Sequence, residues 1–333
     1  MTGYIIRRVL WFVPVLFCVG LITFTIAHLT PGGPFDTNPD KPLPRATQQA
    51  LEQKFGLHLP LWRQFVRYLF FDIEKDPKTG QNQIHWGAIG GNLGPTYASR
   101  GAQSVQDYLF KGTGDTPSRF GYSARLGLQA LVFALILGIP LGVIAALKQN
   151  TWVDYIALFI STTFISVPTL ISGFFLLVVF AVWLGWFKVL PNWNDPIKPW
   201  ILPTVTLGMS TLALITRLTR SSVLEVKRQD YVRTARAKGL ADMAVNIRHV
   251  LRNAILPVVT IMGPLLAGLI TGAFFTELIF QVPGMGNVFV TSIGRRDYSM
   301  IMGLALFYSF ILTLGNLLVD LAYGVVDPRI SVK

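Results

Sequence analysis

Apolar runs long enough to cross a lipid bilayer are the feature that most limits how this chain can fold. A hydrocarbon core about 30 Å thick needs roughly 20 apolar residues in one helix, and in lipid only helices and closed barrels satisfy every backbone hydrogen bond. Hydrophobic residues make up 52% of the 333 residues and charged residues 14%, whereas a soluble domain has about 25% charged residues. We therefore expect an all-α polytopic membrane protein.

Six segments are apolar enough to serve as transmembrane helices. They are residues 9–27, 123–147, 155–186, 200–215, 255–280 and 300–326. The first follows a basic pair, as in a signal peptide, but its apolar core is too long and no small-residue cleavage site follows, so we expect it to be retained. The third is longer than one crossing requires, which predicts a strong tilt or a bend at Pro168.

The distribution of Lys and Arg predicts the orientation, because these residues accumulate in short cytoplasmic loops. With Arg7 and Arg8 inside, Lys148, residues 217–252 and Lys333 also fall inside. Both termini are then cytoplasmic, and residues 30–121 form one long extracytoplasmic insert. The net charge of +12 is explained by this rule, so it does not point to a nucleic-acid partner. Contact with membrane lipid is expected instead.

The insert has its own helical pattern. Its middle alternates apolar and polar residues at helical spacing, which predicts two short helices broken at Gly56 and Pro60. It is either a small lid packed on the membrane domain or a dedicated binding domain. The expected division is residues 1–121, one transmembrane helix plus this insert, and residues 122–333, a core membrane domain with a cytoplasmic loop at about 217–253.

The basic loop is expected to contain two helices joined by a glycine. Residues 222–238 hold good helix formers without Pro or Gly, and Gly239 sits where a left-handed residue usually ends a helix. Asp242 is placed to cap a second helix. An apolar stripe on that helix comprises Met243, Ile247, Val250 and Leu251, opposite a polar face of Asn246, Arg248, His249 and Arg252. Two interpretations remain open: an interfacial helix on anionic headgroups, and a docking element for a cytoplasmic partner.

These stretches together resemble a known family. "RTARAKG", followed by a basic helix and "LRNAILPVVT", is similar to the EAA loop in membrane subunits of ATP-binding-cassette (ABC) importers, in the version found in dipeptide and oligopeptide permeases. "YIIRRVL", "FGLHLPLWRQF", "GIPLGVIAALK", "LTRSSVLEV", "VPGMGNVFVTSIGRRDY" and "LLVDLAYGVVDPRI" resemble its B-type subunit in the same order. Arg233 stands where other importers have the acidic residue that names the loop, and Gly33 where this family commonly has an Asp.

The resemblance implies a type I ABC importer (MetI-like) permease fold of six transmembrane helices in a prokaryotic plasma (inner) membrane. It also implies that the glycine elbow inserts into an ATPase subunit as a coupling helix. The residues implied at or beside that contact are Arg233, Thr234, Ala235, Lys238, Gly239, Leu240 and Asp242. Ala235 can instead serve only close packing, and Lys238 can be solvated. The implied partners are a second related permease subunit, two ATPase subunits and an extracytoplasmic substrate-binding protein.

A second constellation is expected at the external mouth of the pathway, where the resemblance implies that the binding protein docks. Pro283, Gly284 and Gly286 predict a turn, and "NVFVTSIG" predicts a short helix before a charged group. That group comprises Arg295, Arg296 and Asp297. The arginines either pair locally with Asp297 or contact the docked partner.

No catalytic, cofactor or metal constellation is recognised. The sequence contains no G-x-x-x-x-G-K-[ST], so ATP hydrolysis is expected to come from a partner. His28, Asp154, Glu277 and Asp320 fall near span ends, where anchoring or helix capping explains them better than an ion relay. An ion-coupled carrier and a membrane-embedded enzyme are the rival classes. Di- or oligopeptide is the leading substrate, with nickel, glutathione or oligosaccharide as alternatives.

Overall fold

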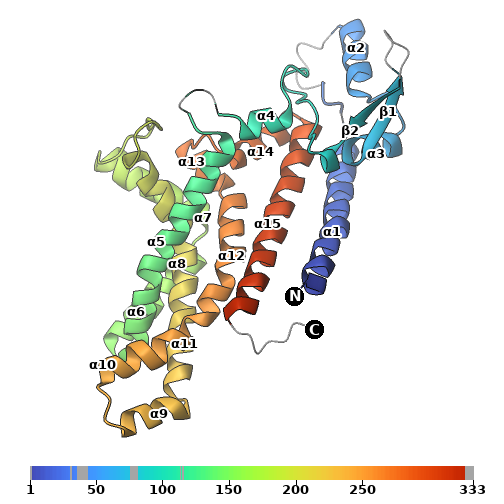
Figure 1. The fold of residues 1–333 in the computed structure, drawn as a ribbon. Coiled ribbons are helices and arrows are strands. Elements are labelled where there is room, and N and C mark those ends of the chain that lie inside the picture. The colour runs from blue at the N-terminus through green and yellow to red at the C-terminus, as the bar shows by residue number, and fades with distance from the viewer. Residues whose placement is uncertain are drawn as a thin grey trace. The chain divides into compact units, whose positions relative to one another are not determined.

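The computed structural model describes residues 2–30, 32–35, 44–75, 82–112, 114 and 116–326, most of them helical (Figure 1). By internal contacts the chain divides into two compact units. The first unit is Met1–Tyr122 with Pro283–Thr313, and the second is Ser123–Val282 with Leu314–Val332. The charged tail with Arg329 and Lys333, part of the basis for the predicted topology, lies outside the described residues.

Within the described residues, up to six segments are long and apolar enough to cross a membrane when each bent helix pair counts as one span. Four single helices are long and apolar enough: Ile6–Leu29, Arg119–Leu147, Lys198–Lys227 and Tyr298–Val319. Two further pairs qualify together, Trp152–Ser166 with Thr169–Trp183 and Asp242–Ala254 with Leu256–Thr271. The first pair bends by 102° across Val167 and Pro168, which confirms the bend predicted there.

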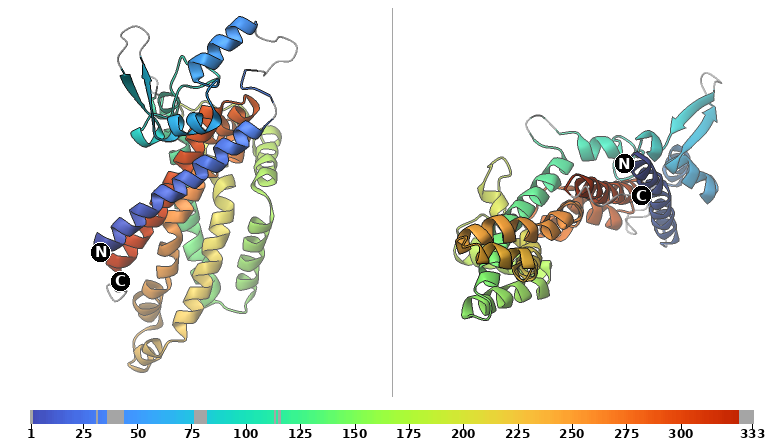
Figure 2. Two further views of the ribbon diagram at one scale, coloured as in Figure 1. Left: turned by 90° about the vertical axis from the view of Figure 1, so that its right-hand side faces the viewer. Right: turned by 60° about the horizontal axis from the view of Figure 1, so that its bottom comes forward.

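The first unit combines one span with the insert. Its elements are α1 (Thr2–Leu29), α2 (Arg45–Phe55), α3 (Leu61–Leu69), β1 (Phe71–Lys75), β2 (Asn82–Trp86), η1 (Ala88–Gly90), α4 (Val105–Phe110), α14 (Met285–Gly294) and the first part of α15 (Tyr298–Val326). α1 lies alongside α15 (Figure 2), with Phe12 stacked edge-on against Phe310. The core here joins α1, α3 and α15 through Phe24, Phe65 and Leu306.

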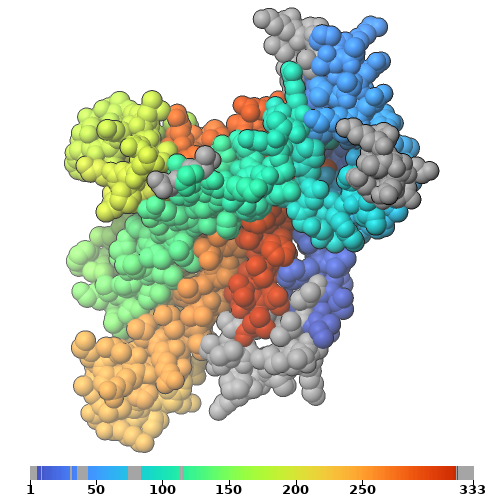
Figure 3. Space-filling model, turned by 45° about the horizontal axis from the view of Figure 1, so that its top comes forward, coloured from blue at the N-terminus to red at the C-terminus, as the bar shows by residue number. Residues whose placement is uncertain are grey.

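The insert confirms the two predicted helices and adds a hairpin. α2 ends at Gly56, whose φ of 69° is left-handed, and α3 begins after Pro60. β1 and β2 then pair antiparallel, from Phe71 opposite Trp86 to Lys75 opposite Asn82. Side chains of the insert gather in one blue-to-cyan mass (Figure 3). We did not predict the hairpin, although apolar residues alternate with polar ones on both sides of a turn-rich "DPKTG".

The second unit is a helical core. Its elements are α5 (Arg119–Leu147), α6 (Trp152–Ser166), α7 (Thr169–Leu177), η2 (Val178–Trp183), α8 (Lys198–Lys227), α9 (Asp230–Ala237), α10 (Asp242–Ala244), η3 (Val245–Leu251), α11 (Arg252–Ala254), α12 (Leu256–Thr271), α13 (Phe274–Phe280) and the last part of α15. α8 is a central helix, since α6, α7, α11, α12 and α13 all contact it. It runs beyond the expected 200–215 span.

Glycines in α5 let it approach α8 closely. A Cβ on Gly142 would lie 2.6 Å from the Thr216 carbonyl oxygen, and one on Gly138 would lie 3.0 Å from the Leu212 carbonyl oxygen. Two small residues one turn apart are the usual way for membrane helices to pack backbone against backbone. α8 is thereby fixed before it enters the basic loop.

Candidate functional site

The basic loop begins as a continuation of α8 and then changes direction. α8 ends at Lys227, Gln229 is extended, and α9 starts at Asp230. The single helix predicted over 222–238 is therefore wrong. On a straight helix Val223 and Val232 would lie about 13 Å apart along the axis, yet both belong to one buried cluster. Burying Val232 in that cluster requires the break.

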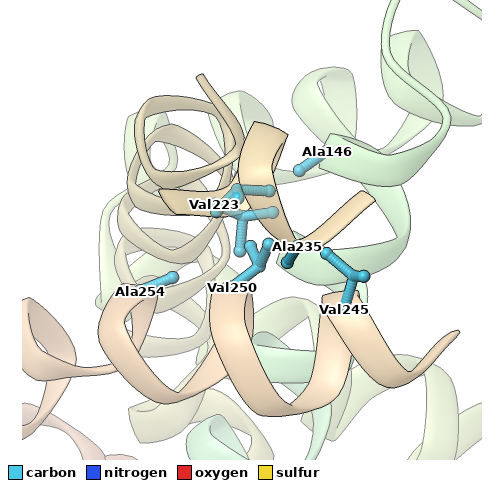
Figure 4. Packing of buried hydrophobic residues seen from close by; sticks show 7 residues of the cluster. Ala146, Val223, Ala235, Val245, Val250 and Ala254 are labelled. Atoms are coloured by element: carbon cyan, nitrogen blue, oxygen red, sulfur yellow. The ribbon is translucent and has the colours of Figure 1, made fainter. Parts of the chain in front are cut away.

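The buried cluster ties the loop to the core helices. Its members come from α5, α8, α9, η3 and α11 and point toward one another (Figure 4). They are Ala146, Val223, Val232, Ala235, Val245, Val250 and Ala254. All are small or β-branched, which lets the backbones of five elements approach closely. The loop is thus a packed extension of the helical core.

The second helix of the loop differs from the prediction in its winding. η3 is a π-helix, so residues five apart share a face, and Val245 and Val250 are buried at 0% and 2% exposure. Met243 and Ile247, assigned to the apolar stripe on α-helical spacing, are instead 74% and 52% exposed. Asp242 also does not cap the helix, because the N-cap position belongs to Ala241.

Gly239 forms the elbow between the two helices. Its φ is 77°, the left-handed conformation predicted for it, and its N–H donates to the Arg236 carbonyl over 2.9 Å. No atom lies within 4 Å of the position a Cβ would occupy. The glycine is therefore required for backbone conformation and not for space. Arg236 and Asp242 bracket the elbow, with Nε and Oδ1 3.4 Å apart.

Most of the predicted coupling residues lie exposed at this elbow. Arg233 pairs with Asp230 over 3.7 Å, but both side chains are more than 70% exposed, so the pair contributes little to stability. The Thr234 hydroxyl donates to the Asp230 carbonyl. Ala235 is the exception, because it packs inward in the buried cluster. The exposed residues are Arg233, Thr234, Lys238, Gly239, Leu240 and Asp242.

Apolar side chains accompany these charges. Tyr231, Leu240, Met243 and Ile247 are between 43% and 74% exposed, and basic residues of α9 lie between them in the chain. We call these four residues, with Arg233, Arg236 and Lys238, the elbow surface. Several exposed large apolar residues within one short loop mark an interaction site more often than isolated ones do.

An ion pair fixes α6 to α8 in the same unit. The Arg220 guanidinium donates from Nε and Nη2 to the two Asp154 oxygens, at 2.6 and 2.7 Å. Asp154 is 1% exposed and also accepts the Asn150 N–H. We expected anchoring or capping for Asp154, but it forms a bidentate bridge that the sequence did not reveal. Its partner lies 66 residues away.

Glu277 and His28, which also lie near span ends, have hydrogen-bond partners within their own units. Glu277 is fully buried on α13, and the Ser123 hydroxyl donates to it over 2.6 Å. The ring of His28 has Nδ1 2.9 Å from the Phe24 carbonyl oxygen and Nε2 3.3 Å from the Gln64 amide oxygen. The Asp320 side chain lies outside what the structure describes.

The predicted outer turn is arranged differently from the expectation. The left-handed residue is Gln281, with φ of 54°, and Gly284 is the N-cap of α14. Gly286 lies inside α14 and is buried, so it takes no part in the turn that we assigned to Pro283, Gly284 and Gly286. α14 itself confirms the short helix predicted before Arg295.

The three charged residues after α14, Arg295, Arg296 and Asp297, differ in exposure and in hydrogen-bond partners. Arg295 is exposed. Arg296 is half-buried, has φ of 54°, and donates to the Gly33 carbonyl over 3.4 Å. Asp297 is 1% exposed, and its two oxygens accept the N–H groups of Ala98 and Met300. Asp297 is therefore a structural cap of α15.

The environment of Asp297 also affects a neighbouring tyrosine in the insert. Burial raises the pKa of Tyr97 to about 12, and the Asp297 carboxylate acts in the same direction. Tyr97 therefore stays neutral at physiological pH. Among the described residues, no group of three or more His, Cys, Asp or Glu is placed to hold a metal ion.

Comparison with known proteins defines the class. The model of the family "Binding-protein-dependent transport system inner membrane component" matches residues 138–332, and the chain belongs to this family of ABC-importer permeases. It is therefore a multi-pass inner-membrane protein.

Particular relatives cover nearly the whole chain. The dipeptide transport system permease protein DppB of Bacillus subtilis is 40% identical, over 99% of this chain and 98% of its own length. The oligopeptide transport system permease protein OppB of Escherichia coli K12 is 37% identical, over 99% of both. Among solved structures, a chain of the MetNI methionine ABC transporter matches with a TM-score of 0.51 at 17% identity. It covers 63% of this chain and 94% of its own, and supports the MetI-like fold.

Proposed function

We propose that this chain is the permease subunit of an ABC importer for di- or oligopeptides, driven by ATPase subunits that dock on its elbow surface. The observation that supports this most directly is the left-handed Gly239 turn, which carries exposed apolar and basic side chains on a rigidly packed base. The names of the two permease relatives supply the substrate class. We further propose a heterodimer with a second related permease subunit, two ATPase subunits and an extracytoplasmic binding protein.

The mechanism follows from how the elbow is attached. α9 and η3 pack on Val223 of α8 and Ala146 of α5, so a displacement of the elbow moves these helices with it. An ATPase that binds the elbow surface and closes on ATP would transmit a rigid-body motion into the spans. No catalytic step in this chain is required.

Reconstitution of the complete transporter tests the substrate class. We expect ATP-dependent uptake of labelled di- or pentapeptides into proteoliposomes when loaded binding protein is present. Uptake of glutathione or nickel without peptide uptake would show that the proposed substrate class is wrong. Transport by this chain alone, driven by an ion gradient, would overturn the ABC assignment.

Accessibility labelling tests the proposed topology, in which both termini and residues 217–252 are cytoplasmic and residues 30–121 face outward. Lys78, a natural choice in the insert, lies outside the described residues, so exposed Gln103 replaces it. In a Cys18→Ser background, an impermeant thiol reagent should label Gln103→Cys in intact cells. Lys238→Cys should react only after permeabilisation. The reverse pattern would invert the topology.

Arg295 is the better candidate of the outer pair for docking the binding protein, because it is exposed whereas Arg296 contacts Gly33. Arg295→Gln should slow association of loaded binding protein several-fold at low salt and little at high salt, since a surface charge acts mainly on encounter. Surface-immobilised transporter and stopped-flow mixing would measure this. An unchanged rate at both salt concentrations would remove Arg295 from the docking surface.

A further inference from the structure

A groove runs between α1 and α3 in the first unit. It has a volume of about 450 Å³ and extends along α1 from Phe17 to Leu29. All lining side chains except Thr25 and His28 are aliphatic or aromatic. Phe65 of α3 is one of the lining residues and stacks edge-on against Phe17 and Phe24 of α1.

The two polar lining residues are already engaged. The Thr25 hydroxyl donates to the Leu21 carbonyl over 2.7 Å, and His28 contacts Phe24 and Gln64 as described above. An extended polypeptide in this groove would bury its backbone amide groups against hydrocarbon without hydrogen-bond partners, which is unfavourable. The walls therefore suit an occupant without hydrogen-bonding groups along its length.

The position of the groove indicates which occupant that is. α1 is a membrane span over Ile6–Leu29, and the stretch from Phe17 to Leu29 rises about 18 Å, close to the ~15 Å depth of one leaflet. Outside the groove, the same helix exposes Leu10, Val13, Ile22 and Ile26 at about 60%. The groove thus continues the exposed apolar surface of a membrane span.

α3 lies at the end of α1 (Figure 1), and its residues Leu61, Trp62, Phe65 and Val66 line the groove there. It buries Phe65 and Leu69 while Leu61 and Trp62 remain 56% and 68% exposed. An amphipathic helix with an exposed Trp at a span end is typical of the membrane interface, where the indole lies at headgroup depth. The exposed side chains of α3 would then lie at headgroup depth, at the outer end of an occupant of the groove.

We propose that the α1–α3 groove binds one acyl chain of a phospholipid from the leaflet on the side of the insert. The chain lies along α1 from Leu29 toward Phe17, and α3 rests over it at headgroup level. The bound lipid ties the insert to the bilayer surface. This inference does not depend on the transported substrate.

Photocrosslinking in nanodiscs tests the site in the fully assembled transporter. A phosphatidylcholine with a diazirine in one acyl chain should label peptides of residues 17–29 and 61–70. Leu21→Trp fills the groove and should lower the labelling of 61–70 at least fivefold. Ile22→Trp is the matched control, because Ile22 neighbours Leu21 and is 58% exposed but does not line the groove.

Equal labelling in the two variants would overturn the proposal. Should Leu21→Trp fail to assemble, Trp62→p-benzoylphenylalanine decides the question alone, because it places a photoreactive aromatic side chain at a position that lines the groove. A crosslink from that position to phospholipid supports the proposal. A crosslink to the second permease subunit would show that protein covers the groove and would overturn it.

Discussion

Gly239→Val should reduce substrate uptake strongly while leaving insertion and folding intact. A β-branched residue resists the left-handed conformation that Gly239 adopts at φ 77°, at a cost of about 1–3 kcal/mol, a shift of roughly 5- to 150-fold in a coupled equilibrium. The elbow should relax and misplace Leu240 and Lys238 for the ATPase. Uptake, and stimulation of ATPase activity by loaded binding protein, should both fall at least about fivefold in proteoliposomes, with unchanged subunit stoichiometry on purification.

Gly239→Asn separates strain from contact. Because no atom approaches the Cβ position and Asn tolerates the left-handed region, this variant should keep most of its activity. Arg248→Gln is the control for simple headgroup binding, since Arg248 is exposed on the second helix. If Gly239→Val transports normally while Arg248→Gln releases the loop from the membrane surface, the loop is an interfacial helix and the coupling role is wrong.

The sequence predicted the parts of this fold that depend on local rules. Gly56 and Gly239 take the left-handed conformation because a helix ends there, and Pro168 bends a span because it removes a backbone donor. Apolar length predicted the approximate positions of the other spans, but the span predicted at residues 255–280 is wrong at its end, because α12 stops at Thr271 and α13 is a separate helix. These features depend on neighbours within a few residues.

Predictions failed where distant packing decided the local structure. The π-helical winding of η3 follows from placing Val245 and Val250 together in a cluster with Val223 and Ala146, and a 3.6-residue period cannot anticipate it. The same cluster breaks the helix after Lys227. Likewise, Asp297 follows two arginines in the sequence, which suggests a local ion pair. In the structure it is buried and accepts the N–H of Ala98, 199 residues away.

Breaking the Asp154–Arg220 bridge should destabilise the second unit markedly. Asp154 is 1% exposed and Arg220 19%, so Asp154→Asn leaves a largely buried guanidinium without its counter-charge. Loss of one partner of a buried pair costs about 3–5 kcal/mol, and the residual exposure of Arg220 places this one near 3 kcal/mol. The melting temperature of the detergent-purified transporter, followed by tryptophan fluorescence, should fall by roughly 6–12 °C.

A double-mutant cycle separates the bridge from the packing around it. Arg220→Met should also lower the melting temperature. The fall in melting temperature of the double variant Asp154→Asn with Arg220→Met should be much smaller than the sum of the two single falls, because this variant leaves no unpaired buried charge. Arg233→Gln is the matched control, since the Arg233–Asp230 pair is exposed and should change the melting temperature by less than about 2 °C. Additive losses in the cycle would mean that Asp154 stabilises α6 through Asn150 alone, and that the bridge between α6 and α8 contributes nothing.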